Sequence, residues 1–460
     1  HQNNHMKLSF HGSVRGVTGS CHLLKAKDVD GHERQLLFDC GMYQGEQMCG
    51  SKNKEEFGFD PMDINHLFIT HPHADHTGRT PKLVKEGFRG KIYMTEPCVG
   101  LSKLVLEDAH HIMVEDSKKC GSSVLYELVD LMTAFDQVEG VGYHEEIEPF
   151  PGIKVMFHDA GHVLGSAFIS VKAEGKTIIF SGDIGNDNVP ILPDTEQIHS
   201  ADYVVCESTY GHRVHEGKVE RSERLKLAIE ETIKNKSVLM IPAFSIERTQ
   251  ELLYEINLLL KNELKTNIQI YLDSPMAIKA TELYREYKNY LRFDAPILEE
   301  KDRDFFSFPG LHETLDVQSS KQINYSPPPK IIIAGSGMMS GGRIMHHLIR
   351  YLGDPKNQLL IIGYQARGTT GRKIYEGAKK VKIFREEVHV NAKITAIGAF
   401  SAHGDMDKLT RWISPKDGKT PEKIFLVHGD PESKEVFATH LRHKLRTDVV
   451  IPGHHDVFEL

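Results

Sequence analysis

The segment Thr70–Gly78 concentrates four side chains that can bind a metal ion: His71, His73, Asp75 and His76. It follows the apolar run Ile64–Ile69, so it leaves the end of a predicted strand. In an extended loop, residues i and i+2 point the same way, and His71 and His73 can therefore share one ion. Where the chain turns into a helix at Asp75, the side-chain directions change, so Asp75 and His76 can face a second ion. Imidazole and carboxylate ligands favour zinc, with manganese as the alternative.

Three later residues can supply the ligands that this loop lacks. Each follows a strand-like run and has glycine beside it: His162 in AGHVLG, Asp183 in SGDIG and His428 in LVHGD. Glycine lets the backbone approach an ion closely. A single residue of this kind more often caps or closes a loop, but together the three complete a site for two metal ions.

The elements that must position these residues begin with short β-type runs between Met6 and Glu207. Two helical stretches, Asp75–Lys85 and Val99–Ser117, interrupt them, which predicts a mixed sheet with helices packed on it. Glu174 and Gly175 separate two alternating runs, so the segment Ala167–Ser181 is predicted to form a hairpin.

After Glu207, helical runs alternate strictly with apolar strands. Runs such as Ile331–Ile333 and Leu359–Ile362 are apolar on both faces, which implies a parallel sheet covered on both sides. We therefore expect a second domain of the doubly wound α/β type. Another βαβαβ run begins at Ile394, and its periodicity alone does not assign it to either domain.

Composition excludes several classes of protein. The 460 residues are 40% hydrophobic and 26% charged, which fits neither a disordered nor a membrane-spanning protein. The net charge of −8 argues against nucleic-acid binding. The charge is segregated, however, because Lys321–Arg385 contains 12 Lys and Arg residues but only Asp354 and Glu376 as acids. A basic surface of this kind suits a polyanionic substrate, although an ordinary solvated face gives the same count.

The cysteines contain no C-x-x-C pair and all lie in the first half of the chain: Cys21, Cys40, Cys49, Cys98, Cys120 and Cys206. We expect six buried free thiols in a reducing compartment. This pattern predicts a cytoplasmic location and no membrane partner.

The order of these acidic and histidine residues resembles that of the metallo-β-lactamase superfamily. Asp39 in LFDCG matches its first motif, and the HPHADH loop and the three later ligands follow in the same order. The resemblance implies a four-layer αββα fold, with Asp39 orienting the metal loop. It also implies one zinc on His71, His73 and His162, a second on Asp75, His76 and His428, and Asp183 as the bridge between them.

Further motifs are similar to those of the β-CASP nucleases within this superfamily. ESTYG from Glu207, FSAHGD over Phe400–Asp405 and His428 correspond to motifs A, B and C, and PAF, DSPMA, GSGM, GGR and GYQARGTTGR look typical of the inserted domain. The resemblance implies a metallo-β-lactamase domain over 6–209 and 394–460, with a β-CASP insert over 210–393. One departure is Glu247, which stands where the family commonly has glycine.

The resemblance implies a ribonuclease, because the DNA-repair branch of the family usually carries valine instead of histidine at motif C. Two zinc ions about 3.5–4 Å apart would activate a hydroxide for attack on a phosphodiester, leaving a 5′ phosphate and a 3′ hydroxyl. The expected catalytic residues are Asp75, Asp183, His403 and Glu207. His403 would protonate the leaving oxygen, and Glu207 would hold its tautomer.

The insert is expected to hold single-stranded RNA by its phosphates, through backbone N–H groups at glycine-rich helix starts and through forked arginines. The candidates are Ser336, Gly342, Arg343, Tyr364, Arg367, Thr369 and Arg372. These glycines can instead serve helix entry alone. Two other functions stay open: a hydrolase of small esters, thioesters or lactams, and a catalytically silent scaffold of an RNA-processing complex. The sequence also leaves open whether the chain forms a homodimer.

Overall fold

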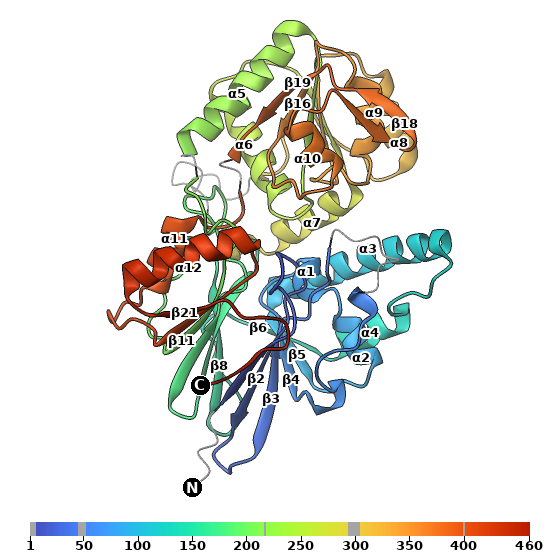
Figure 1. Ribbon diagram of the computed structural model, residues 1–460. Coiled ribbons are helices and arrows are strands. Elements are labelled where there is room, and N and C mark those ends of the chain that lie inside the picture. The colour runs from blue at the N-terminus through green and yellow to red at the C-terminus, as the bar shows by residue number, and fades with distance from the viewer. Residues whose placement is uncertain (1–5, 45–51, 216–217, 293–303, 399–400) are drawn as a thin grey trace. The chain divides into compact units, whose positions relative to one another are not determined.

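The computed structural model describes residues 6–44, 52–215, 218–292, 304–398 and 401–460 (Figure 1). Two residues singled out above, Phe400 of the second motif and Cys49, lie outside this range. The chain forms two compact units. The first comprises residues 1–187, 193–214 and 403–460, and the second comprises residues 188–192 and 215–402.

The first unit contains two seven-stranded sheets. The first sheet has the order β22-β1-β2-β3-β4-β5-β6, formed by Val457–Glu459, Lys7–Phe10, His22–Lys27, Glu33–Phe38, His66–Phe68, Lys91–Thr95 and Val138–Val141. The second has the order β21-β20-β11-β10-β9-β8-β7, formed by Asp448–Val450, Lys423–Val427, Tyr203–Glu207, Lys176–Phe180, Ala167–Ala173, Ile153–Asp159 and Ile147–Phe150.

Helices cover the outer face of each sheet. Beside the first sheet lie α1 (Ala74–Thr77), α2 (Thr80–Lys85), α3 (Glu96–Cys120) and α4 (Leu128–Asp136), and beside the second lie α11 (Met406–Ile413) and α12 (Pro431–Leu445) (Figure 1). One apolar core joins buried side chains of both sheets, and separate cores pack each sheet against its own helices. The expected four-layer αββα fold is confirmed.

The ends of neighbouring strands bring distant segments together. β3, β4, β5 and β6 pair in parallel, as do β10, β11, β20 and β21, so the carboxyl ends of each set share one edge. The rings of Phe38 and Phe180, the last residues of β3 and β10, stack across the two sheets with centroids 3.9 Å apart. This contact holds the two sheet edges together next to the loops that follow β3 and β10.

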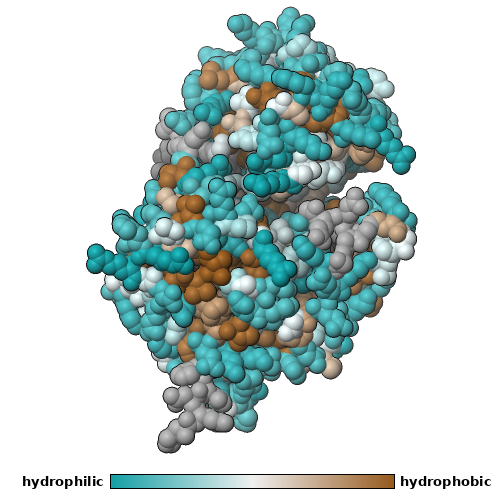
Figure 2. Space-filling view, viewed as in Figure 1, coloured by the Kyte–Doolittle hydropathy of each residue, from teal (hydrophilic) through white to brown (hydrophobic). Residues whose placement is uncertain are grey.

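The second unit has a six-stranded sheet in the order β14-β13-β15-β12-β16-β19, and its recorded pairings are all parallel. Its strands are Leu311–Glu313, Gln269–Asp273, Lys330–Ala334, Val238–Pro242, Gln358–Ile361 and Lys393–Ala396, and β17 (Lys380–Ile383) and β18 (Glu386–His389) form a separate hairpin. Its helices are α5 (Lys218–Asn235), α6 (Arg248–Asn262), α7 (Pro275–Glu286), α8 (Val317–Gln322), α9 (Ile344–Tyr351) and α10 (Thr370–Tyr375). The expected parallel α/β domain is confirmed, and Figure 2 shows mostly hydrophilic residues over its visible face.

Short 3₁₀ turns complete the described elements: Lys52–Lys54, Pro61–Asp63, Lys288–Tyr290 and Ile323–Tyr325. The predicted hairpin is present, because Ala173 pairs with Lys176 and both intervening residues have positive φ, 49° at Glu174 and 79° at Gly175. Such a two-residue turn matches the twist of the flanking strands. The predicted helix Asp75–Lys85 is instead divided into α1 and α2 at Gly78 and Arg79.

The chain passes from the first unit to the second between residues 214 and 215, and residues 188–192 also group with the second unit. The strand Lys393–Ala396 pairs with β16 of the second unit, and the change to the first unit comes between residues 402 and 403. β20 and β21 of the last segment then extend the second sheet of the first unit. Periodicity does not show this division, because both sheets accept parallel strands of similar apolar character.

Glu247 adopts the backbone conformation for which the family commonly uses glycine, with φ of 70°. Its side chain and that of Gln250 form a reciprocal capping box at the start of α6, and the Tyr284 hydroxyl donates to its carboxylate. Burial, followed by the neighbouring Glu251, holds the pKa of Glu247 well above its usual range. These hydrogen bonds offset the strain of a non-glycine residue at this turn.

Among the five cysteines that the structure describes, one differs from the expected free thiol. Cys21, Cys40, Cys98 and Cys206 are buried free thiols, but Cys120 is in a disulfide bond. The absence of a C-x-x-C motif thus did not predict its redox state. Within the described part of the chain, no helix combines the length and apolar character that crossing a membrane requires.

Gly41 allows the loop after β3 to lie against α1. A Cβ atom at this position would come within 1.6 Å of the Asp75 carbonyl oxygen. Replacing Gly41 with Ala should lower the melting temperature by roughly 6 °C or more, because two backbone segments cannot move apart as a flexible side chain can. Differential scanning calorimetry measures the change.

Gly16→Ala is the matched control, since a Cβ atom there meets nothing within 4 Å. Equal melting temperatures for the two variants would contradict this account of Gly41.

Candidate metal centre

The HPHADH segment bends sharply after β4. His71 and His73 lie in the loop, and Asp75 and His76 lie in the single helical turn of α1. Backbone N–H groups of His76 and Thr77 donate to the His73 carbonyl oxygen at 2.9 and 3.0 Å, which fixes this turn. The change of direction expected at Asp75 is therefore present, and the four side chains divide into two pairs.

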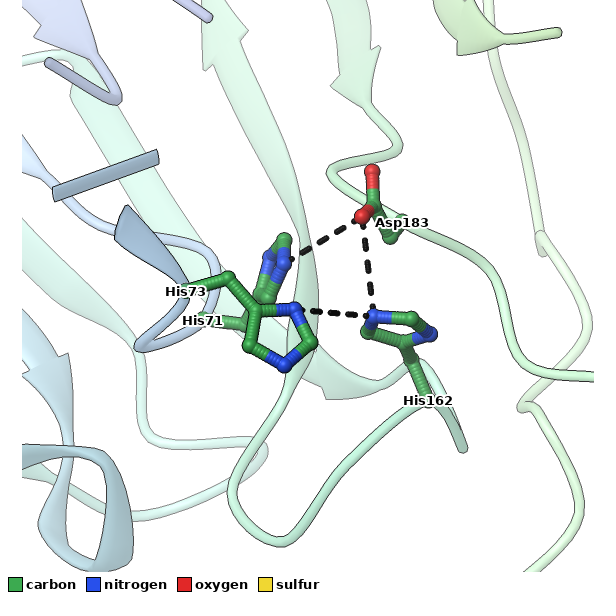
Figure 3. Close-up of side chains that lie close together, drawn as sticks. All are labelled: His71, His73, His162 and Asp183. Carbon is green, nitrogen blue, oxygen red and sulfur yellow. Dashed lines mark hydrogen bonds and ion pairs between the residues drawn. The ribbon is translucent and has the colours of Figure 1, made fainter. Parts of the chain in front are cut away.

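The first pair lies beside His162 and Asp183, which come from the loops after β8 and β10 (Figure 3). His73 Nδ1 is 3.4 Å from His162 Nε2. Asp183 Oδ2 lies 3.3 Å from His71 Nε2 and 3.5 Å from His162 Nε2. One nitrogen or oxygen from each of the four residues lies within 4.8 Å of the others, so the group has the size of a metal site.

The second pair lies beside His428 and the other oxygen of Asp183. His428 Nε2 is 3.1 Å from both His76 Nε2 and Asp75 Oδ2. Asp183 Oδ1 lies 3.3 Å from His76 Nε2 and 3.4 Å from His428 Nε2. Asp183 thus presents one carboxylate oxygen to each group, as a ligand shared by two ions would.

The donor set fits divalent metal ions. Ring nitrogens of different histidines face one another at these distances, where a shared cation would satisfy their lone pairs. Among the described residues, His71 Nε2 and Asp183 Oδ1 have no hydrogen-bond partner although both are buried. Buried polar atoms left without a partner cost free energy, and a metal ion would supply the missing interaction.

The ionisation of these groups also favours bound cations. Burial lowers the pKa of His71 to about 3 and that of His73 to about 4, so both rings are neutral and can act as ligands. Burial would raise the pKa of Asp183, but the surrounding histidines hold it well below its usual range. Burial opposes charge on His76 as well, yet three nearby carboxylates, Asp183 first, raise its pKa well above the usual value.

Asp39 orients the HPHADH loop through three hydrogen bonds. Its Oδ2 accepts from His76 Nδ1 at 2.7 Å and from the Thr70 hydroxyl at 2.8 Å, and its Oδ1 accepts from the Thr70 N–H at 2.8 Å. A metal ion bound at Nε2 would displace one proton of the His76 ring, and Asp39 would keep the other proton on Nδ1. The structure therefore brings Asp39 to the position expected of an orienting carboxylate.

His428 is held in a strained backbone conformation. Its φ is 52°, and its N–H donates to the Ser13 carbonyl oxygen at 2.8 Å. The Thr209 hydroxyl lies 3.0 Å from His428 Nδ1 and donates to the His428 carbonyl oxygen at 3.2 Å. These contacts from two other loops keep Nε2 turned toward Asp75 and Asp183.

Glu207 and His403 form a third group of side chains, beside the Asp183 carboxylate. His403 Nδ1 is 3.2 Å from both oxygens of Glu207 and 3.9 Å from Asp183 Oδ2. Glu207 is fully buried, and its Oε1 also accepts from the Ile184 N–H at 2.7 Å. Burial disfavours an imidazolium here, but Glu207 and then Asp183 outweigh it and raise the pKa of His403 to about 9. The Glu207 carboxylate therefore favours the positively charged ring of His403.

Some positioning residues were not predicted from the sequence. Thr70 and Thr209 direct ring nitrogens, and Asp187 ties the Asp183 loop to α11 by accepting from Lys408 Nζ at 2.9 Å. The sequence offered one signal for each threonine: Thr70 directly precedes the ligand His71, and Thr209 lies within the ESTYG motif. No pattern marks Asp187, because its partner is 221 residues away.

In the second unit, the expected phosphate ligands lie in loops around α9 and α10. Arg367 is exposed, whereas Arg372 donates from Nε to Glu376 at 2.6 Å. Thr369 caps α10 by accepting from the Arg372 N–H at 3.2 Å. Tyr364 is half-buried beside them.

Ser336 and Gly342 stabilise the turn in which they themselves lie. Ser336 Oγ accepts from the Ser340 N–H at 3.1 Å. Gly342 has φ of 76°, and a Cβ atom there would lie 2.4 Å from the Gly335 carbonyl oxygen. These contacts favour the simpler interpretation of Gly342, in which glycine is needed for entry into α9.

Arg343 has structural partners rather than a free guanidinium. Its Nη1 donates to Asp273 Oδ1 at 2.8 Å and to the Thr314 carbonyl oxygen at 2.6 Å, and its Nη2 donates to the Leu315 carbonyl oxygen at 2.9 Å. A guanidinium committed in this way holds loops of the second unit together. We therefore do not include Arg343 among the proposed phosphate ligands.

Three family models match the chain. The metallo-beta-lactamase superfamily model matches residues 15–212, and the Beta-Casp domain model matches residues 249–374. A Zn-dependent metallo-hydrolase RNA specificity domain matches residues 387–452. Together they confirm the family resemblance seen in the motifs.

Curated relatives extend over nearly the whole chain. A ribonuclease of Thermus thermophilus is 36% identical, over 93% of this chain and 94% of the relative. An RNase J-like protein of Methanocaldococcus jannaschii is 31% identical, over 97% of each chain. Cleavage and polyadenylation specificity factor subunit 3 of Dictyostelium discoideum is 28% identical, over 95% of this chain and 55% of that protein.

A solved structure has a similar fold. It is a protein of unknown function from Enterococcus faecalis, with a TM-score of 0.55 over 99% of this chain and 100% of that chain. At 11% sequence identity the likeness concerns the fold alone.

The contacts of Asp39 predict a loss of metal affinity when its charge is removed. Asn accepts the positive φ of 59° at this position and has the same shape, but it does not hold the Nδ1 proton of His76 as a carboxylate does. Asp39→Asn should weaken zinc binding about 10- to 100-fold, measured by competition with a chromophoric chelator.

Asp28→Asn is the control, since Asp28 is also buried and accepts from Arg34 Nε at 2.8 Å. If Asp39→Asn binds zinc as tightly as Asp28→Asn, Asp39 does not tune the metal ligands.

Proposed function

The chain belongs to the β-CASP family of the metallo-β-lactamase superfamily, and from this premise we propose how it acts as a metal-dependent ribonuclease. Relatives that are ribonucleases, together with the metallo-hydrolase fold, identify the chain as a hydrolytic RNA nuclease. The observation that carries the proposed chemistry is the Glu207–His403 pair beside Asp183, within a cluster of seven ligand side chains.

We propose two zinc ions per chain, with manganese as the alternative metal. His71, His73 and His162 would hold one ion, Asp75, His76 and His428 would hold the other, and Asp183 would be shared. When bound, the two ions would supply Lewis acidity and lower the pKa of a water molecule toward about 7. Asp39, Thr70 and Thr209 fix the histidine tautomers that this arrangement needs.

His403 is the proposed general acid. Its Nδ1 faces the Glu207 carboxylate, so Nε2 would deliver the proton to the leaving 3′ oxygen of the cleaved phosphodiester. Glu207 would keep the ring charged and in one orientation. A water molecule, not the 2′ hydroxyl of RNA, would be the nucleophile, and the products would carry a 5′ phosphate and a 3′ hydroxyl.

The second unit is proposed to hold single-stranded RNA. The support is the GYQARGTTGR loop, which contains the exposed Arg367 and lies at the start of α10. We propose Arg367, Arg372, Thr369 and Tyr364 as its contacts, with Ser336 and Gly342 supplying the neighbouring turn. The expected division into 6–209 with 394–460 and 210–393 remains the proposed functional division between cutting and holding RNA.

The proposal extends to the state and location of the protein. We propose a cytoplasmic RNA-processing or decay enzyme, which the four buried free thiols favour and the disulfide at Cys120 does not. A homodimer is a further proposal, and sedimentation analysis of the purified chain tests it.

RNA labelled at either end, with and without a 5′ triphosphate, tests the function directly. We expect zinc-dependent cleavage that leaves 5′ phosphates and 3′ hydroxyls, whether it starts inside the RNA or at its 5′ end. Faster turnover of nitrocefin or a thioester than of RNA would favour the small-substrate hydrolase. Failure of a preparation with bound metal to cleave any substrate would favour the scaffold.

The role of His403 predicts the behaviour of His403→Ala. The single-turnover rate of RNA cleavage should fall about 10²- to 10⁴-fold with metal content unchanged, because the leaving oxygen loses its proton donor. Added imidazole should restore part of the rate. His199→Ala, at an exposed histidine of the same unit, is the control. Full activity in His403→Ala would remove this residue from the mechanism.

The proposed RNA contacts predict a change in salt dependence. Each phosphate contact on a single strand contributes about 0.7 to the slope of log affinity against log salt. The double variant Arg367→Ala/Arg372→Ala should therefore bind RNA more weakly and show a slope smaller by about 1.4. Lys356→Ala/Lys382→Ala is the control, since both lysines are exposed in the same basic segment. Identical slopes for both double variants would refute these contacts.

A further inference from the structure

A second cluster of potential metal ligands lies in the first unit, outside the seven-residue centre. His144 Nε2 lies 2.7 and 2.8 Å from the two carboxylate oxygens of Glu196, and His158 Nδ1 lies 3.5 Å from Glu196 Oε2. The three ligand atoms lie within 4.8 Å of one another. Two imidazoles therefore face one carboxylate from different sides.

The three side chains come from separate segments that the fold holds firmly. His158 is in β8, its ring stacks on Phe168 with centroids 4.8 Å apart, and its Nε2 lies 2.9 Å from Ser170 Oγ. The His144 N–H donates to the Phe157 carbonyl oxygen at 3.0 Å, and its φ is 63°. A histidine in this left-handed conformation is uncommon, and here it directs the ring toward Glu196.

Glu196 is anchored to the end of β8 by its backbone and its side chain. Its N–H donates to the Asp159 carbonyl oxygen at 3.0 Å, and its Oε1 accepts from the Asp159 N–H at 3.2 Å. The carboxylate is thus fixed in place before any ligand binds. Its side chain is 31% exposed and that of His144 is 60% exposed, so an ion from solution can reach the cluster.

Two carboxyl groups, those of Glu196 and Asp159, lie near each other at the end of β8. Burial would raise the pKa of Glu196, but hydrogen bonds from His158, His144 and the Asp159 N–H lower it to about 2. Burial first, and then the negative charge of Glu196, raise the pKa of the neighbouring Asp159 to about 7. A hydrogen bond from the Gly161 N–H acts in the opposite direction. A divalent cation between the imidazoles would lie next to the Glu196 carboxylate and compensate its charge.

We propose that His144, His158 and Glu196, with Asp159 beside them, form a third metal site that takes a divalent transition-metal ion of the zinc class. Two imidazole nitrogens and a carboxylate suit such an ion, whereas calcium and magnesium prefer sites made of oxygen ligands alone. The exposed side leaves room for water as a further ligand.

An ion at this site would brace the loop that contains His162. The Gly161 N–H donates to Asp159 Oδ1 at 2.8 Å, and the Thr195 hydroxyl donates to the Ala160 carbonyl oxygen at 2.9 Å. Fixing His158 and Glu196 on one ion would therefore hold residues 159–162 against residues 195–196. The proposed role is structural support for the main centre rather than a part in the reaction.

Equilibrium dialysis of the full chain against buffered free zinc tests the proposal, with metal counted by mass spectrometry. We expect three zinc ions per chain in the parent protein and two in both His144→Ala and Glu196→Gln. His111→Ala is the matched control, because His111 and Glu115 form an exposed ion pair at 3.4 Å without a second imidazole, and it should keep three ions. Two ions in the parent, or an unchanged count in the cluster variants, would overturn the proposal.

Two further measurements distinguish this site from nonspecific surface binding. Anomalous diffraction at the zinc edge should give a peak between His144 and His158, and its absence from crystals that show peaks at the main centre would overturn the proposal. With the main centre loaded in both proteins, amide exchange over residues 159–162 should be slower in the parent than in Glu196→Gln. Equal exchange would overturn the bracing role.

Discussion

The candidate metal centre depends on one buried carboxylate, that of Asp183, on which five histidine side chains from four segments of the chain converge. Histidines 71, 76 and 162 and then His428 lie within 3.5 Å of its two oxygens, and His403 lies at 3.9 Å. Each of these side chains is buried or nearly so, and several present lone pairs to one another. Positive charge among the ligands would stabilise such an arrangement, so bound metal ions would contribute to the stability of the fold as well as to the proposed reaction.

The fold brings these side chains together by holding the ends of strands in place, and not by forming a pocket around them. The stacked rings of Phe38 and Phe180 join the two sheets one residue before Asp39 and three residues before Asp183. The glycines of the loops then permit close approach: a Cβ atom at Gly41 would overlap the Asp75 carbonyl oxygen, and one at Gly185 would overlap that of Gly161. Glycine at these two positions therefore permits close contacts between loops.

Local patterns in the sequence predicted the parallel α/β domain, the hairpin and the two ligand pairs of the HPHADH loop, whereas the four-layer fold and the complete ligand sets were implied by the family resemblance. The HPHADH spacing, the apolar strands and the glycines at strand ends each indicate a structure within a few residues. What the local patterns missed depends on distant partners: Thr209 meets His428 across 219 residues, and Asp187 meets Lys408 across 221. The sequence reasoning also did not identify the strands β2, β6, β7, β14, β18 and β22. Their segments carry weak local patterns, and pairing with neighbouring strands stabilises them.

The basic segment shows why a count of charges does not define a binding surface. Lys330 belongs to that segment, yet it is 1% exposed, and its Nζ donates to the Ile323 and Ser326 carbonyl oxygens at 2.7 Å. Arg343 is likewise committed, to Asp273 and two carbonyl oxygens. Buried cations satisfied by the chain's own oxygens contribute little to attraction of a distant polyanion. In the proposed role of the second unit, the attraction of RNA would therefore depend on the positive charges that remain accessible. Among the candidates, Arg367 is exposed in the loop before α10, and Arg372 in the first turn of α10 is partly exposed and paired with Glu376.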